Sequence, residues 1–537
     1  MKFPSILPLL FSLIAIYSFS QSNQNIPLYR EKFLLYEKYL NSTDCSVHTS
    51  IKPYYNTPVL EAINDTIKKS FARNKDPKAS IASEAKKTVN TLSVTGVLSS
   101  DLGYEQAGRS ENKFLLDGGL KLEGTHLNKF SYNFIFLSGN SSFPSYIDSS
   151  IKHSSVVPGI GNAYGSTTGY SYQYYSGYFS YSPNKIFNFQ IGKDKHFWGD
   201  GYRSLFISDV SNSYPFLQLS ATVWKLKYVC LFAWMKDVTA PSGLQSDFKN
   251  KFGSFHYLSW NVTKRFNMGL FESVIWQGTD ANRTRSFDVN YLNPVIFYRP
   301  VEYSLGSSDN ALIGISFKEK IAKKQLFYGQ LIIDDLYVET LKADIVHACL
   351  PFIKEQWGWW GNKYGFQLGF KSFDLFTIKN LSFQTEVNRV RPYTYSHGSV
   401  QQNYGNYNQP LADPLGANFT ESVSFLNYRY KKWMFETEFL YAQYGKDENG
   451  INYGGNIFLS YITRPTSLDY YTYVGQGLKT NLSYTKLQIS YYPIPSADLM
   501  AEAGVALRQE NNSLSSSNST LIFIGIKTGI MNRYSDF

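Results

Sequence analysis

From about residue 92 to the end of the sequence, apolar and polar side chains alternate with a period of two residues, which is the period of a β-strand. In the clearest segment, residues 223–234, one face is aromatic and apolar with a Trp at each end, and the opposite face carries two lysines. Residues 381–388, 426–441 and 487–507 repeat this alternation. Strands of this kind are typical of a barrel wall that stands between lipid and a polar lumen.

The start of the sequence has the features of a secretory signal peptide over residues 1–20. Lys2 supplies the positive charge, residues 6–16 form an apolar stretch, and small residues suit cleavage near Ser20. Beyond this signal, the sequence has no run of about 18 apolar residues, the length that a transmembrane helix needs. Because only helices and closed barrels satisfy their backbone hydrogen bonds in lipid, such an exported chain is expected to cross a membrane as a barrel.

The composition favours the same fold. Aromatic residues make up 17% of the chain, with 43 Tyr and 39 Phe, and membrane barrels place such residues in girdles at both bilayer interfaces. The mean hydropathy of −0.28 excludes a helical membrane protein. A soluble β-sandwich or propeller would also alternate, but its apolar face would favour aliphatic core residues. We therefore expect an all-β fold, a transmembrane antiparallel β-barrel of about 16–18 strands.

The patterns divide the chain into three regions: a signal peptide at 1–20, a periplasmic helical segment at 21–91 and an outer-membrane barrel at 92–537. In the second region, Thr57 and Pro58 are typical of a helix start, and apolar residues follow at helical spacing. The barrel pattern of the third region predicts that the protein lies in the outer membrane of a Gram-negative bacterium. Long loops are expected outside the cell, and short turns are expected on the periplasmic side.

Three segments rich in small or polar residues lack any period, and we expect them to be long outer loops: residues 138–169, 391–419 and 510–519. The sequence ends in an apolar stretch at 521–526 and an aromatic residue, Phe537. We expect a final strand that closes the barrel and a terminal aromatic residue that serves as a barrel-assembly signal.

The formal charge of +10 comes from basic residues that are dispersed along an exported chain, so nucleic acid is not expected as a partner. An acidic glycan or lipopolysaccharide suits this charge, and so does a solvated surface without a ligand. The three cysteines, Cys45, Cys230 and Cys349, show no disulfide framework and no metal-ligand spacing, and unpaired thiols are the simpler interpretation.

Motifs of enzymes are lacking in the sequence. Residues 475–480 faintly resemble a phosphate loop without its glycine spacing, and residues 447–450 have the composition of a turn without the ligand spacing of a calcium loop. We find no nucleophile elbow and no HExxH motif. We therefore expect no catalytic residue, no metal and no cofactor.

Several stretches carry a family resemblance. They are residues 192–205, 208–209, 214–216, 252–260, 293–302, 391–397 and 409–419. They resemble the capsule-assembly Wzi-like outer-membrane proteins and, within that group, the RemB-like gliding-motility branch of Bacteroidetes. The resemblance implies a large barrel with a helical bundle on its periplasmic side. It also implies that the protein holds capsular polysaccharide at the cell surface or serves surface gliding.

The first candidate site is an eleven-residue segment at the end of an expected strand. Its functional side chains are those of Lys193, Asp194, Lys195, His196, Trp198, Asp200 and Arg203. Arg and Lys bind acidic sugar groups, Trp stacks on sugar faces, and the glycines between them allow an unusual turn. The alternative is structural, in which the two aspartates and the arginine pair with one another inside the lumen and the Trp packs there.

Two aromatic groups are secondary candidates for glycan binding. They are Trp357, Trp359 and Trp360, and Tyr393, Tyr395 and His397. The tryptophans either stack on sugar rings or anchor the barrel at the membrane interface. The second group either contacts a glycan or a protein partner, or lies in a loop that folds into the barrel mouth and plugs it.

The sequence thus favours a non-enzymatic barrel that acts at the cell surface in capsule or exopolysaccharide attachment or in gliding motility. Its expected partners are surface polysaccharide or lipopolysaccharide, outer-membrane lipid, and other gliding or envelope proteins. Two alternatives remain open. One is a porin-like pore with an open, charged lumen, and the other is a scaffold that binds envelope proteins through its N-terminal segment.

Overall fold

The computed structural model of this chain describes residues 25–54, 58–71, 90–127, 129–166, 169–238, 247–279, 286–294, 309–350, 356–494 and 498–537. The expected signal peptide lies outside these residues. The α-helices within them are α2 (Arg30–Leu40), α3 (Pro58–Phe71), α4 (Ser145–Ser154) and α6 (Val338–Cys349). Over the described ranges, no helix has the length and apolar character that crossing a membrane requires.

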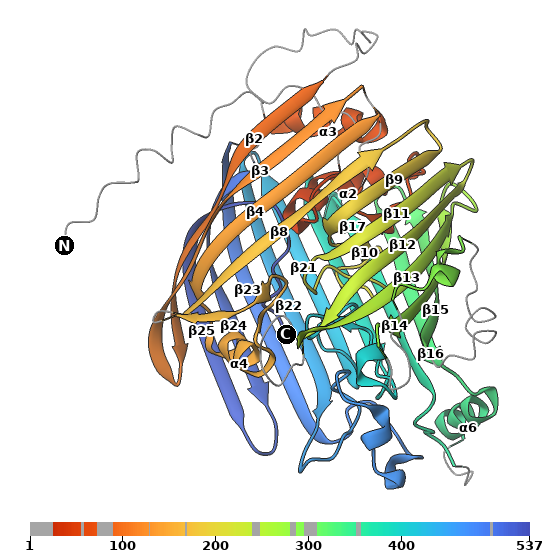
Figure 1. Cartoon of the computed structure of the whole chain (residues 1–537). Coiled ribbons are helices and arrows are strands. Elements are labelled where there is room, and N and C mark those ends of the chain that lie inside the picture. Colours follow the sequence, from red (N-terminus) through yellow and green to blue (C-terminus); the bar gives the residue numbers. More distant parts are fainter. Residues whose placement is uncertain are drawn as a thin grey trace.

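Eighteen strands of the described chain form one closed antiparallel ring (Figure 1). Each strand pairs with its neighbours in chain order, and the ring closes where the last strand pairs with the first, from Ser99 opposite Lys527 to Gln106 opposite Thr520. The strands are β2 (Thr91–Ala107), β3 (Arg109–His126), β4 (Phe130–Ser142), β8 (Gly169–Tyr181), β9 (Phe187–Asp194), β11 (Tyr214–Val223), β12 (Leu226–Asp237), β13 (Lys249–Trp260), β14 (Phe266–Gln277), β15 (Asn310–Ala322), β16 (Gln325–Asp335), β17 (Lys363–Phe373), β18 (Leu381–Val390), β21 (Phe419–Tyr430), β22 (Trp433–Lys446), β23 (Leu478–Ile494), β24 (Leu499–Asn511) and β25 (Ser516–Thr528). The expected antiparallel β-barrel is confirmed, at the upper end of the expected strand number.

Smaller elements lie in the connections between these strands. The short strands are β1 (Ile51–Lys52), β5 (Val156–Val157), β6 (Gly161–Asn162), β7 (Tyr164–Ser166), β10 (Phe197–Trp198), β19 (Gly405–Asn406) and β20 (Gln409–Pro410). The 3-10 turns are η2 (Val289–Leu292), η3 (Leu375–Thr377), η4 (Val400–Gln402), η5 (Tyr461–Thr463) and η6 (Thr466–Leu468). Of these, β1 pairs with β10, which brings residues near the start of the chain against a segment between β9 and β11.

The two ends of the barrel differ in the length of their connections. At one end, the strands are joined by short turns such as Trp224–Lys225 and Lys431–Lys432. At the other end, the connections are long and include α4 and α6, which lie at the lower end in Figure 1. We call these the short-turn end and the long-loop end. In outer-membrane barrels, short turns face the periplasm and long loops face the outside of the cell.

One of the expected outer loops is mostly strand. Residues 510–519 belong largely to β24 and β25, which form a hairpin joined by residues 512–515. The Asn and Ser composition there indicated a loop, but the backbone of each residue in a hairpin is satisfied by its partner strand whatever the side chain.

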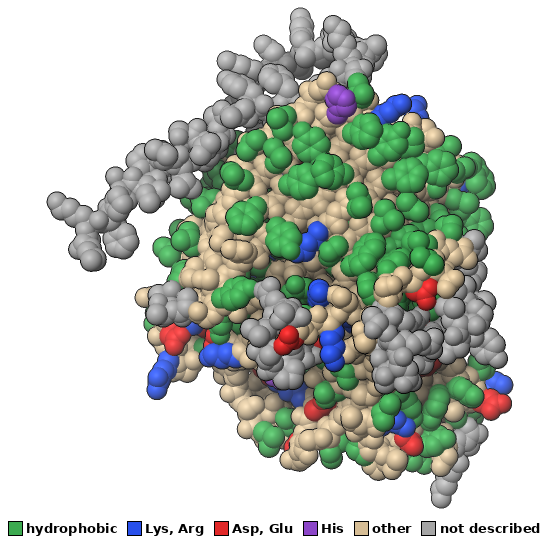
Figure 2. Space-filling view, in the orientation of Figure 1, with side chains coloured by type: hydrophobic (Ala, Val, Ile, Leu, Met, Phe, Trp, Pro, Cys, Tyr) green, Lys and Arg blue, Asp and Glu red, His purple; other side chains and the backbone are tan. Residues whose placement is uncertain are grey.

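The outer face of the wall carries apolar side chains. The lumenal face carries buried side chains, some apolar and some polar or charged. Leu102 on β2 and Ile524 on β25 are each 64% exposed, whereas the alternate residue Glu105 is buried. Figure 2 shows hydrophobic side chains spread over the wall, and acidic side chains gathered toward the lower, long-loop end of this face. This alternation is the one that the sequence predicted.

Part of the predicted lipid-facing surface is covered by protein. The segment 286–294, between β14 and β15, lies against the outer side chains of the wall. The Phe287 ring stacks on Trp234 at 4.9 Å between ring centroids, and Tyr291 packs on Trp276 at 4.7 Å. Phe232 on the same face is fully buried. The two-residue period showed which side chains point outward, but it contains no information on a loop that folds over them.

The three cysteines are free thiols.

Residues 25–54, which we call the N-terminal plug, pack inside the mouth at the short-turn end. Glu37 of α2 pairs with Lys371 of β17 at 2.7 Å between charged atoms, and His48 Nδ1 lies 2.9 Å from the hydroxyl of Ser259 on β13. The backbone N–H of Asn25 donates to the hydroxyl of Tyr178 on β8. The plug therefore contacts strands on several sides of the ring and is part of the barrel interior.

Residues 529–537, which we call the C-terminal tail, turn back into the lumen after β25. Arg533 pairs with Asp117 of β3, and the hydroxyl of Tyr534 donates to Asp209 at 2.7 Å. Arg508 of β24 donates to the carbonyl oxygen of Phe537 at 3.2 Å. Phe537 thus lies inside the barrel. The expected final strand that closes the barrel is confirmed by the pairing of β25 with β2, and the role of Phe537 as an assembly signal stays a prediction.

Candidate functional site

The segment between β9 and β11, residues 195–213, turns from the long-loop end into the lumen. Trp198 is fully buried there and lies against Tyr257 and Phe271, with ring centroids 5.6 and 6.0 Å away. Its carbonyl oxygen accepts a hydrogen bond from Gln330 of β16 at 2.9 Å. A Cβ on Gly201 would lie 2.7 Å from the carbonyl oxygen of Arg203, so only glycine allows this close turn.

Arg203 is the centre of an ion network in the lumen. Its side chain is 1% exposed, and Nη2 lies 3.1 Å from Glu421 Oε1 of β21 and 2.9 Å from Asp536 Oδ2 of the C-terminal tail. The backbone N–H of Arg203 donates to Glu386 of β18 at 2.9 Å. Burial and the neighbouring Glu421 raise the pKa of Asp413, a nearby carboxyl, well above its usual range.

The other polar residues of the first candidate site point in different directions. Lys193 lies at the wall, with Nζ 3.4 Å from the centre of the Tyr175 ring, and Asp194 accepts from the backbone N–H of Lys195 at 2.9 Å. Lys195 Nζ donates to the carbonyl oxygen of Asp209 at 3.0 Å, and burial lowers its pKa to about 8.

His196 and Asp200 are held by separate neighbours. Burial lowers the pKa of His196 to about 3, and its Nδ1 lies 3.3 Å from the hydroxyl of Tyr214. Asp200 accepts from the hydroxyl of Thr49 in the N-terminal plug. Burial alone would raise the pKa of Asp200, but Lys318, 3.6 Å away, and other cations lower it. Apart from Lys193, these side chains are thus held inside the barrel and do not form a surface cluster.

The predicted alternative is right that Trp198 packs inside the lumen, but it is wrong that the two aspartates and the arginine of this segment pair with one another. Arg203 instead pairs with Glu421 and Asp536, which the sequence analysis did not single out. Glu386 does lie on a polar face of its strand with Gln384 and Asn388, and this is a signal that it faces the lumen. Glu421 has no such signal, because Phe419 and Val423 share its face. Asp536 carries no such signal, because it lies in an irregular tail.

The second candidate group, Trp357, Trp359 and Trp360, lies in the connection between β16 and β17 at the long-loop end. These rings pack against the connection between β22 and β23. We call the combined set the aromatic loop surface; it comprises Trp357, Trp359, Trp360, Tyr461, Arg464, Tyr471 and Tyr473. The tryptophans are half-buried in loops, which is not the position of an anchor on the barrel wall.

The contacts within the aromatic loop surface are close. Tyr471 meets Trp357 edge-on at 5.6 Å between ring centroids, and the guanidinium of Arg464 lies 3.5 Å from the centre of the Trp360 ring. Arg464 Nη2 also binds Asp469 at 2.7 Å. Tyr471 and Tyr473 are each 54% exposed. The surface therefore presents exposed phenol rings on a base of tryptophan.

The third candidate group lies in the connection between β18 and β21, which folds into the mouth of the barrel. Tyr395 is fully buried and its hydroxyl donates to the carbonyl oxygen of Leu205 at 2.8 Å, and the Tyr393 hydroxyl donates to the carbonyl oxygen of Asn452 at 2.9 Å. His397 is half-buried beside Tyr461, with ring centroids 5.7 Å apart. Two members of this group thus border the aromatic loop surface: His397 beside Tyr461, and Tyr393, whose ring meets Trp360 edge-on at 6.0 Å between ring centroids. The loop has the plugging position of the predicted alternative.

No cluster of three or more His, Cys, Asp or Glu side chains in the described part of the chain could hold a metal ion. The polar groups that do cluster are paired as acid and base, as Arg203 is with Glu421. The arrangement offers two things: a rigid, ion-paired interior and an exposed aromatic surface with one arginine.

The closed ring of eighteen strands, with its apolar outer face, has the fold of an outer-membrane β-barrel. Wzi, described as an outer-membrane protein involved in group 1 capsule assembly in Escherichia coli and as a carbohydrate-binding β-barrel, is similar to this chain in fold. The TM-score is 0.55 and the identity is 12%, over 95% of this chain and 100% of Wzi.

Other solved barrels also align with this chain. OprD of Pseudomonas aeruginosa aligns at a TM-score of 0.42 with 10% identity, over 84% of this chain and 98% of OprD. OccAB2 of Acinetobacter baumannii aligns at 0.42 with 11% identity, over 80% of this chain and 97% of OccAB2. No protein-family model and no curated protein matches the sequence.

Replacing Arg203 tests the ion network. Arg203→Met leaves Glu421 and Asp536 buried without their cation, which should cost about 3–5 kcal/mol of stability. In gel electrophoresis with detergent, we expect the band of the folded barrel to be replaced by the band of the unfolded chain at a lower temperature than in the wild type. Arg203→Lys keeps the charge but loses the forked geometry, so it should recover part of the loss. An unchanged conversion temperature for the Met variant would contradict a structural role.

The buried ring of His196 predicts a pH dependence. Because its pKa falls from 6.5 to about 3 on folding, the unfolded chain binds a proton that the folded barrel does not. The stabilisation is complete above pH 6.5 and is lost as the pH falls toward 3, by about 3 kcal/mol at pH 4. His196→Phe should therefore show a shallower fall of unfolding temperature between pH 7 and 4 than the wild type.

The matched control is His153→Phe, at an exposed position of α4. This variant should follow the wild-type pH profile. If the His196 and His153 variants have the same profile, the ring of His196 does not titrate on unfolding.

Proposed function

We propose that this protein is a non-enzymatic outer-membrane barrel that holds an acidic polysaccharide at the cell surface. The observation that carries the proposal is the aromatic loop surface, which presents exposed rings beside Arg464 at the long-loop end. The proposed role is capsule or exopolysaccharide attachment. The likeness to Wzi in fold is consistent with this role, since Wzi is described as a carbohydrate-binding barrel.

The chemistry of the surface suits an acidic glycan. Aromatic faces carry negative potential and attract the C–H groups on a sugar face, as they attract cations. A guanidinium has five N–H donors, and Arg464 directs three of its N–H groups to Asp469 and to the carbonyl oxygen of Tyr461. The remaining donors are available to a sugar carboxylate or sulfate.

The filled interior supports an anchor more than a channel. The N-terminal plug, residues 195–213, the connection between β18 and β21 and the C-terminal tail all occupy the lumen. They are interlocked: the backbone N–H of Ser208 donates to the carbonyl oxygen of Leu411 at 2.7 Å. A loop surface that stands on such a support keeps its rings in fixed positions, which lowers the entropy cost of holding a glycan.

A role in gliding is the finer form of the proposal. The stretches that carry the RemB-like resemblance meet in space, because residues 195–213 and 391–418 bond to each other inside the lumen. Residues 252–260 form β13, whose Phe252 contacts the outer segment 286–294. We propose that this scaffold positions the long loops on polysaccharide that links the cell to a surface.

The test is a double variant, Tyr471→Ala with Tyr473→Ala. Each lost ring contact is worth about 1 kcal/mol, so the two together should weaken binding of an acidic exopolysaccharide about tenfold or more. The measurement is retention of fluorescently labelled polysaccharide on cells that carry the variant, and binding to the purified barrel in detergent.

The control is Trp224→Ala with Phe376→Ala. These aromatic residues are more exposed, at 78% and 81%, but lie at the opposite, short-turn end. The control should bind like the wild type. Equal retention by all three proteins, at equal yields of folded barrel, would overturn the proposal.

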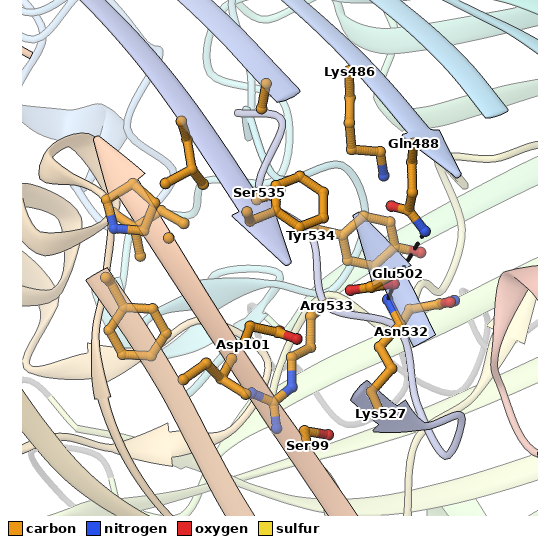
Figure 3. Close-up of a pocket in the computed structure, with 18 of the residues that line it drawn as sticks. Ser99, Asp101, Lys486, Gln488, Glu502, Lys527, Asn532, Arg533, Tyr534 and Ser535 are labelled. Carbon is orange, nitrogen blue, oxygen red and sulfur yellow. Dashed lines mark hydrogen bonds and ion pairs between the residues drawn. The ribbon is translucent and has the colours of Figure 1, made fainter. Parts of the chain in front are cut away.

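A substrate-specific pore is the second candidate function, and one cavity favours it. The cavity has a volume of about 270 Å³ and lies inside the barrel beside the C-terminal tail. Figure 3 shows Lys527 bonded to Glu502, which also accepts from Gln488. These two wall charges are already paired, but Asp101 Oδ1 and Arg533 Nη1, which also line the cavity, have no hydrogen-bond partner among the described residues and are the groups that a polar solute would bind.

Planar-bilayer conductance separates the two functions. An anchor with a filled lumen should give no steady current when the purified protein is inserted. A steady, solute-dependent current would favour the pore and count against the anchor.

A further inference from the structure

The turns at the short-turn end are strongly basic. Their described residues are 127, 129, 182–186, 224–225, 261–265, 323–324, 374–380, 431–432 and 498. Together they contain ten Lys or Arg residues, which are Lys129, Lys185, Lys225, Lys264, Arg265, Lys323, Lys324, Lys379, Lys431 and Lys432. The acidic residues in these turns are Asp374 and Asp498, and each is paired with a lysine of the N-terminal plug. Asp374 also pairs with Lys324 of the same end, at 2.8 Å. We call the ten residues the basic rim.

The basic rim faces solvent at the edge of the barrel. All of its members are exposed except Lys432, which is half-buried and donates to the carbonyl oxygen of Pro493. The rim spans seven of the eight turns, so it surrounds the barrel and is not a local patch. Its ammonium groups are far from the aromatic loop surface, which lies at the other end.

Exposed aromatic side chains lie immediately beside the rim. Trp224 adjoins Lys225, whose Nζ is 5.2 Å from the indole ring, and Lys431 Nζ lies 5.2 Å from the ring of Tyr430. Phe130 and Tyr181 stack on the outer face of neighbouring strands, with ring centroids 4.5 Å apart. Aromatic side chains of this kind mark the depth of the membrane interface. Flanking lysines therefore reach the headgroup layer.

The long-loop end does not share this charge pattern. Its charges are mixed and pair locally, as Lys152 does with Asp148 at 2.6 Å and Arg464 with Asp469 at 2.7 Å. In Figure 2, the acidic side chains of the visible face also lie toward that end. The short-turn end is thus the side that attracts anions.

From these observations, we infer that the basic rim binds anionic phospholipids, such as phosphatidylglycerol, in the leaflet at the short-turn end. The phosphate of a lipid held against the aromatic belt lies at the depth of the rim ammonium groups. The attraction of one lysine near a membrane surface corresponds to about a fivefold preference for an anionic over a zwitterionic headgroup. A ring of such contacts fixes the depth and tilt of the barrel.

The test uses the full-length protein reconstituted in phosphatidylcholine bilayers. A trace of spin-labelled phosphatidylglycerol or spin-labelled phosphatidylcholine reports the fraction of lipid that is immobilised at the protein surface. We expect about two- to fivefold selectivity for phosphatidylglycerol at low salt, and a loss of that selectivity in concentrated salt.

Two quadruple variants assign the selectivity to one end. The first replaces Lys185, Lys225, Lys323 and Lys431 by Gln, and the second replaces Lys152, Lys249, Lys342 and Lys479 by Gln. All eight lysines are exposed, and the second set lies at the long-loop end. The first variant should lose at least half of the selectivity, and the second should keep it.

Three results would overturn the inference. The first is no selectivity in the wild type, and the second is an equal loss in both variants. The third is rim-dependent co-sedimentation with peptidoglycan in the absence of lipid selectivity, which would assign the basic rim to the cell wall.

Discussion

Pairing between the last strand and the first is the contact on which the rest of the structure depends. Lipid contains no water to satisfy a free strand edge, so the sheet must close. Eighteen strands make a ring wider than its own side chains can fill. Other parts of the chain therefore occupy the lumen, and these are the N-terminal plug, residues 195–213, the connection between β18 and β21, and the C-terminal tail. The width of the ring thus explains why so much irregular chain lies inside the barrel.

The filling segments are polar as well as apolar, and Arg203 shows how a charge is tolerated among them. A guanidinium removed from water needs carboxylates with good geometry, and Glu421 and Asp536 supply it from the wall and from the tail. The backbone of the same residue binds Glu386 on another strand. One buried cation therefore joins two strands, a lumenal segment and the tail. Such a junction fixes how these parts are arranged more than it adds net stability.

The sequence predicts the wall well because alternation is a local property. Residues 223–234 show which side chains point outward and which point inward. Contacts between distant parts follow no local pattern: Arg203 and Asp536 are 333 positions apart, and Phe287 covers the wall from a loop. For the same reason, the lumenal position of the segment from Lys193 to Arg203 was one of two interpretations of the sequence, but the partners of Arg203 there could not be named. Residue types indicated charge and aromatic character, and only the fold shows whether they are exposed.

The two ends of the barrel differ in the chemistry of their surfaces, and the filled lumen connects them. Rings and mixed charges at the long-loop end remain solvated, as the proposed polysaccharide ligand requires, whereas the basic rim adjoins exposed aromatic side chains of the wall. A force applied to a polymer on Tyr471 would pass through the loops to the buried network around Arg203, and from there to the wall. An empty barrel would let the loops shift under such a force. In this chain, contacts from Trp360 to Tyr393 and from Tyr395 to Leu205 connect the loop surface to the lumenal segment that carries Arg203.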